Sequence, residues 1–123
     1  MTHLKGVVVA HAGLAAAMIG AAEQIAGSDS GLVAVSNVDC DRGTLEEKIT
    51  QAVGDASAIV FIDMPSGSCM VAAMRRLGEK QGVRVVTGVN LAMLVEFIFH
   101  RDGDPDAVAE HIAAVGARAV AAR

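Results

Sequence analysis

The segment GVVVAHAG, residues 6–13, decides the fold of this chain. Its first five residues carry no polar side chain, and three consecutive valines favour a strand because they are β-branched. A strand that is apolar on both faces is typical of a parallel sheet covered by helices on both sides. His11 follows directly, and Gly13 precedes an alanine-rich segment, residues 14–26, with apolar residues at helical spacing. The segment therefore predicts a buried strand that turns at His11 into a helix.

The rest of the chain repeats this alternation. Short apolar runs predict strands over residues 32–35, 58–62 and 83–86, and helices are predicted over residues 44–53, 69–80, 91–99 and 105–116. Thr44 with Glu47 forms a capping-box pattern, and Asp104 before Pro105 is a typical helix start. Residues 117–122 fit either a helix or a final strand.

Four strands separated by helices predict a single α/β domain over residues 1–123. Right-handed crossovers place helices on both faces of a mainly parallel four-stranded sheet, which gives three layers. If the strand order is 2-1-3-4, the order reverses between the first and third strands, and ligands bind beyond their carboxyl ends. His11 ends the first strand and Asp63 the third. We therefore expect these two side chains to meet.

A histidine beside a carboxylate predicts nucleophilic chemistry at this edge of the sheet. The Asp63 carboxylate would accept one ring N–H and leave the other nitrogen of His11 free. Gly13, and Gly67 with Ser68, lie at predicted helix starts, where backbone amides and hydroxyl groups favour an anion such as phosphate. Each residue alone also fits an ordinary loop or capping role, and that alternative stays open on the residues alone.

The composition argues against several other functions. The net charge is −4 and the chain has no Trp or Tyr, so it lacks the cationic surface and the aromatic platform that nucleic acid requires. The sequence contains no GxxxxGK[ST] or GxGxxG motif and no metal-ligand spacing, so we expect no cofactor and no metal. No apolar run approaches the roughly 18 residues of a membrane span.

The remaining histidines and the cysteines receive structural roles at this stage. We expect His3, His100 and His111 to be structural or exposed, because they lie away from the predicted strand ends. Without a signal peptide, Cys40 and Cys69 fit reduced thiols of a cytoplasmic protein. A buried apolar role is expected for Cys69, since no base is evident beside it.

Several segments resemble the mannose-family enzyme IIA domains of the bacterial phosphoenolpyruvate-dependent sugar phosphotransferase system. GVNLAMLVE, residues 88–96, is similar to the family's GVNxPMLxE, and RDGDP, residues 101–105, resembles its acidic link to the last helix. The first strand with His11 resembles the phosphoacceptor turn, and Asp63 through Ser68 resembles the D-x-x-G-G-S turn. The likeness covers nearly the whole chain in order and spacing.

The resemblance implies that His11 is the phosphorylated histidine, Asp63 its carboxylate partner and Ser68 a serine near the phosphate. It implies a phosphotransferase component that accepts phosphoryl from phospho-HPr and passes it to an enzyme IIB for sugar uptake. The membrane would be reached only indirectly, through a permease. A homodimer with exchanged C-terminal strands is also implied, with residues 117–122 as that strand.

The chain departs from the family pattern at the rim of the predicted site. Ala12 stands where the family has Gly, Ala92 where it has Pro, and PSGSC, residues 65–69, replaces Trp-Gly-Gly-Ser-Pro. Two alternatives therefore stay open: a regulatory module that binds a partner according to its phosphorylation state, and a receiver-like domain phosphorylated on Asp63. Receivers place extra acidic residues after the first strand, where this chain has His11.

Overall fold

Four parallel strands form one sheet, ordered β2-β1-β3-β4, in the computed structural model, which describes residues 3–123. Val8 at the centre of β1 lies opposite Ala34 in β2 and Phe61 in β3. The predicted strand order and direction are therefore confirmed. The strands are β1 (Lys5–Ala10), β2 (Leu32–Ser36), β3 (Ala58–Ile62) and β4 (Val83–Thr87).

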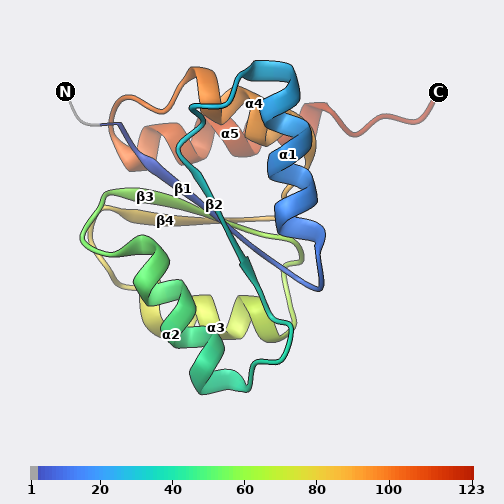
Figure 1. Ribbon diagram of the computed structural model, residues 1–123. Helices are drawn as coiled ribbons and strands as arrows, with labels where there is room; N and C mark the ends of the chain where they lie inside the picture. The colour runs from blue at the N-terminus through green and yellow to red at the C-terminus, as the bar shows by residue number, and fades with distance from the viewer. Residues whose placement is uncertain (1–2) are drawn as a thin grey trace.

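Helices cover both faces of the sheet, which gives the predicted three layers (Figure 1). One face carries α1, α4 and α5, and the other carries α2 and α3. None of these helices, within the described residues, is long and apolar enough to cross a membrane. The helices are α1 (Leu14–Ala26), α2 (Arg42–Val53), α3 (Ser68–Leu77), α4 (Leu91–Phe99) and α5 (Pro105–Arg118).

Alternate residues of the central strands supply two separate cores. Val8 and Phe61 pack under α1, α4 and α5, whereas Val7 and Val60 pack under α2 and α3. All four side chains are fully buried, as the continuous apolar runs predict for strands covered on both faces. Because both faces are closed, the carboxyl edge of the sheet is where polar side chains can gather beside buried strands.

Several element boundaries differ from those predicted. The second helix begins at Arg42, because Asp41 rather than Thr44 is its N-cap and accepts a hydrogen bond from the Thr44 backbone N–H at 2.7 Å. The third helix ends at Leu77, three residues early, with Gly78 as its C-cap. Of residues 117–122, the first two belong to α5, and residues 120–123 have no regular structure in this single chain.

Candidate functional site

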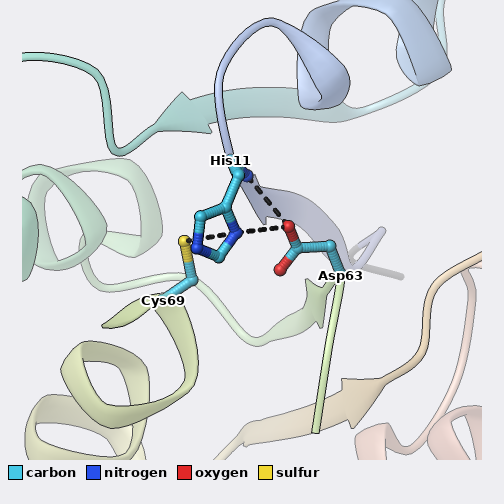
Figure 2. Close-up of side chains that lie close together, drawn as sticks. All are labelled: His11, Asp63 and Cys69. Carbon is cyan, nitrogen blue, oxygen red and sulfur yellow. Dashed lines mark hydrogen bonds and ion pairs between the residues drawn. The ribbon is translucent and has the colours of Figure 1, made fainter. Parts of the chain in front are cut away.

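β1 and β3 are neighbours in the sheet, and their carboxyl ends bring His11 and Asp63 together (Figure 2). His11 Nδ1 and Asp63 Oδ2 are 2.7 Å apart, and the same oxygen accepts the backbone N–H of His11 at 2.9 Å. Asp63 itself is tied to β1, because its backbone N–H donates to Val9. The meeting of these side chains, predicted from the strand order alone, is therefore observed.

The two partners differ sharply in exposure. The side chain of Asp63 is 8% exposed, whereas the ring of His11 is 42% exposed. Burial alone would raise the pKa of Asp63, but the hydrogen bonds from the ring and backbone of His11 outweigh it and hold that pKa below its ordinary value. Asp63 is therefore an ionised acceptor, so Nδ1 of His11 carries the hydrogen and Nε2 keeps its lone pair.

The other oxygen of Asp63, Oδ1, is buried and has no hydrogen-bond partner in the described chain. A carboxylate that is removed from water needs partners for its charge, and here His11 provides most of them. The negative charge of Asp63 therefore favours a positively charged His11 ring beside it. An imidazole that gains charge during a reaction would be stabilised at this position.

Ala12 follows His11 in a left-handed backbone conformation, with φ +53°. Non-glycine residues rarely adopt this region, since it costs roughly 1–2 kcal/mol. Two side chains at the end of β2 hold it: Asn37 Oδ1, just after the strand, accepts the Ala12 N–H at 3.0 Å, and the hydroxyl of Ser36, the last residue of β2, donates to the Ala12 carbonyl at 2.7 Å. Sequence analysis missed both residues, because only the β1–β2 pairing brings them near His11.

The two helices that begin beside His11 lack side-chain caps. Neither Gly13, the N-cap of α1, nor Gly67, the N-cap of α3, supplies a capping hydrogen bond. By contrast, Asp41, Asn90 and Asp104 cap α2, α4 and α5. In α1 the Leu14 N–H already donates to the His11 carbonyl, which leaves the N–H groups of Ala15 and Ala16, whereas α3 offers its first N–H groups from Ser68 onward to an anion.

Gly67 packs directly against the histidine. A Cβ atom placed on Gly67 would lie 3.8 Å from Cε1 of His11, which is ordinary contact, but the φ of +95° favours glycine. Ser68 is the first residue of α3 and is exposed, and Gly13 lies two residues after His11. Asp63 and Gly67 are thus next to the ring, and Gly13 and Ser68 stand at the starts of α1 and α3.

Cys69 is a neighbour of His11 that sequence reasoning did not identify as part of the site. Figure 2 shows the ring between the Asp63 carboxylate and the Cys69 thiol, whose Sγ is 3.9 Å from Nδ1. Burial, and then the charge of Asp63, raise the pKa of Cys69 to about 11. Donor atoms of the three residues lie within 4.8 Å of one another, as in a cation site. The hydrogen bond from Nδ1 to the Asp63 carboxylate orients the ring.

Several known structures are similar to this one over nearly the whole chain. The mannose/sorbose specific IIA subunit of the phosphotransferase system from Enterococcus faecalis is 23% identical with a TM-score of 0.86, covering 99% of this chain and 96% of that one. Phosphotransferase system component EIIA from Streptococcus agalactiae is 19% identical with a TM-score of 0.89, covering 97% and 96%. A sigma-54 interaction domain protein from Enterococcus faecalis is 14% identical with a TM-score of 0.71, covering 96% and 93%. These likenesses establish the fold.

The family follows from a comparison of the sequence itself. Comparison with curated proteins gave no match. The model of the EIIA-man family, described as the PTS system fructose IIA component, matches residues 5–115, which include every residue of the site described above. The chain therefore belongs to the EIIA-Man family of the phosphotransferase system.

Proposed function

We propose that this domain carries a phosphoryl group on Nε2 of His11, accepting it from phospho-HPr and passing it to an enzyme IIB for sugar uptake. The observation that supports this most directly is the hydrogen bond from Nδ1 to the buried Asp63 carboxylate at 2.7 Å. That bond leaves Nε2 as a nucleophile on a ring that is nearly half exposed, within reach of a partner protein. The general activity of the family, phosphoryl transfer, fits this geometry.

The first transfer is a displacement at phosphorus. The Nε2 lone pair of His11 forms a new P–N bond, the P–N bond to the HPr histidine breaks, and its electron pair returns to the HPr ring. The His11 ring gains positive character while Nδ1–H remains bonded to Asp63, whose negative charge stabilises it. The second transfer reverses these roles, with His11 as the leaving group. Both steps depend on positioning and electrostatics.

Uncapped helix starts would hold the phosphoryl oxygens. The candidate donors are the backbone N–H groups of Ala15 and Ala16 in the first turn of α1, the N–H group of Ser68 at the start of α3, and the Ser68 hydroxyl group. Helix N-termini favour anions because unpaired N–H groups and the helix dipole point outward together. A phosphoryl group on His11 would therefore be met by donors from two sides.

The free edge of β4 could accept the C-terminal segment of a second copy of the chain, as in a homodimer with exchanged segments. In the described chain, β4 pairs with β3 alone, and a mainly apolar groove along it is lined by Met70, Met74, Leu77, Val83 and Val85, together with the polar side chains of Arg84 and Thr87. Val120, beyond α5, is 78% exposed, so the tail has apolar surface to bury. We expect a dimer by light scattering; a monomer at micromolar concentration would refute the exchange.

A regulatory role is the second candidate. One protein that shares this fold is described as a sigma-54 interaction domain protein, which raises phosphorylation-dependent binding as an alternative to transport. Phosphorylation on Asp63 has less support. Its side chain is buried, one oxygen already accepts two hydrogen bonds, and its potential metal-ligand group in the described chain contains only His11 and Cys69.

The test is phosphate labelling with phosphoenolpyruvate, enzyme I and HPr. The label should be acid-labile, base-stable and absent from the variant His11→Ala, while the variant His3→Ala, which changes an exposed histidine elsewhere, should keep it. Chase of the label to an enzyme IIB supports the transport role, and a label that no IIB accepts supports the regulatory one. A hydroxylamine-sensitive label would place the phosphoryl group on Asp63, and no label would overturn the proposal.

A further inference from the structure

Two histidines and a glutamate converge where the end of α4 packs on α5. Glu96 and His100 are four residues apart at the end of α4, so they share one face, and His111 faces them from α5. Glu96 Oε2 lies 2.6 Å from His111 Nε2 and 3.1 Å from His100 Nδ1. The two imidazole rings are 5.5 Å apart between their centres. We call these three residues the α4–α5 cluster.

The donor set of the α4–α5 cluster is that of a transition-metal site. Two imidazole nitrogens and a carboxylate oxygen suit Zn²⁺, which takes bonds of about 2.0–2.2 Å to such atoms and leaves its fourth position to water. The three donor atoms already lie within 4.8 Å of one another, so small side-chain rotations would place all of them around one ion. We propose that Glu96, His100 and His111 bind a Zn²⁺-type cation that bridges α4 to α5.

The surroundings favour a cation. A shallow cavity of about 270 Å³ adjoins the cluster and is lined by both histidines together with Asp102 and Asp104. Oε2 of Glu96 already lies between the two imidazoles, so this one oxygen stands beside the donor nitrogens of both histidines. The cavity leaves room on the solvent side for a water molecule as the fourth ligand.

The hydrogen bonds within the α4–α5 cluster contribute little to the stability of the fold by themselves. The side chains of His100 and His111 are 57% and 47% exposed, and exposed pairs of this kind contribute little to stability. A cation changes this, because it binds the folded arrangement far better than the unfolded chain and adds its binding energy to folding. The predicted effect is a brace at the end of α4, which otherwise meets α5 through apolar contacts and, at its start, a hydrogen bond from Asn90 Nδ2 to the Gly116 carbonyl.

The cluster is separate from the proposed phosphorylation site. Asp102, which lines the same cavity, pairs with His3, just before β1 begins. The cavity is therefore at the amino edge of the sheet, whereas His11 is at the carboxyl edge. The cluster can therefore bind a cation whether or not His11 carries a phosphoryl group.

The experiment is calorimetric titration of the tag-free chain with ZnCl₂ near neutral pH. We expect one ion per chain in the unmodified protein, and a rise in its melting temperature on addition of Zn²⁺. Removal of one ligand, in His111→Ala, His100→Ala or Glu96→Gln, should weaken binding by at least the roughly 10–100-fold that loss of an outer-shell partner costs. His111→Gln serves if the alanine variant does not fold.

Two controls keep the outcome specific. His3→Ala removes an exposed histidine that also pairs with a carboxylate, and His11→Ala removes the other potential ligand group, with Asp63 and Cys69. Both should bind Zn²⁺ as the unmodified protein does. No binding, unchanged binding in the cluster variants, or loss of binding only in His11→Ala would each overturn the proposal; the last would place the cation at the phosphorylation site.

Discussion

Replacement of Asp63 by Asn removes the charge beside His11 and keeps the shape of the side chain. A hydrogen bond to a charged group contributes about 1.5–3 kcal/mol. Because the ring of His11 is 42% exposed, solvent screens part of this, and we take about 1.5–2 kcal/mol for the transition state. At about 1.4 kcal/mol per factor of ten, phosphorylation should slow roughly 10- to 30-fold. This is a minimum, because the introduced amide can donate to Nδ1 and so place the ring proton on Nε2.

The assay is single-turnover transfer from phospho-HPr, followed by rapid quench. The variant Asp55→Asn makes the same chemical change at an exposed position and should transfer at the original rate. Circular dichroism confirms that both variants are folded. A folded Asp63→Asn variant that accepts phosphoryl as fast as the unmodified chain would refute the role of the carboxylate.

Three further predictions concern stability and reactivity. Burial raises the pKa of Cys69 to about 11, so iodoacetamide at neutral pH should modify Cys40 in the native protein and reach Cys69 only after unfolding; equal labelling would contradict this. Ala12→Gly should raise the free energy of unfolding by up to about 1 kcal/mol in urea titration, because glycine tolerates the left-handed backbone, and a loss would show that Ala12 is not strained. The pKa of Asp63 lies below its ordinary value of 3.8, so its ionised form stabilises the fold above about pH 4, and this contribution is lost as the pH falls through the lower folded-state pKa. Asp63→Asn should therefore lose less stability than the unmodified chain between about pH 5 and pH 2, and parallel losses would count against the shift.

Most of the fold follows from local pattern. Buried parallel strands such as β3 are continuous apolar runs, and α1 and α4 are framed by glycine or capping residues, so their bounds agree with those predicted. The second helix begins at Arg42, before the predicted Thr44, because Asp41 caps it although Thr44 with Glu47 also satisfies the capping-box pattern. Two adequate caps three residues apart cannot be ranked from sequence, since the choice depends on how the incoming loop packs.

The candidate site was predictable to the extent that it depends on strand order. His11 and Asp63 end strands that a 2-1-3-4 sheet makes neighbours, so their meeting follows from topology. The support from Asn37 depends on the exact path of the loop after β2, and the contact of Cys69 depends on where α3 begins. Neither leaves a periodic signal. Ala12 in place of the family's glycine was the one indication that its backbone needs support.

The most direct test of the central claim is to locate the phosphoryl group on the ring itself. The chain, labelled with ¹⁵N-histidine, is phosphorylated through enzyme I and HPr and observed by ³¹P and ¹⁵N NMR. We expect ³¹P coupling to Nε2 of His11, with the hydrogen still on Nδ1, where it is donated to Asp63. Coupling to Nδ1, or a phosphorus signal from an acyl phosphate on Asp63, would contradict it.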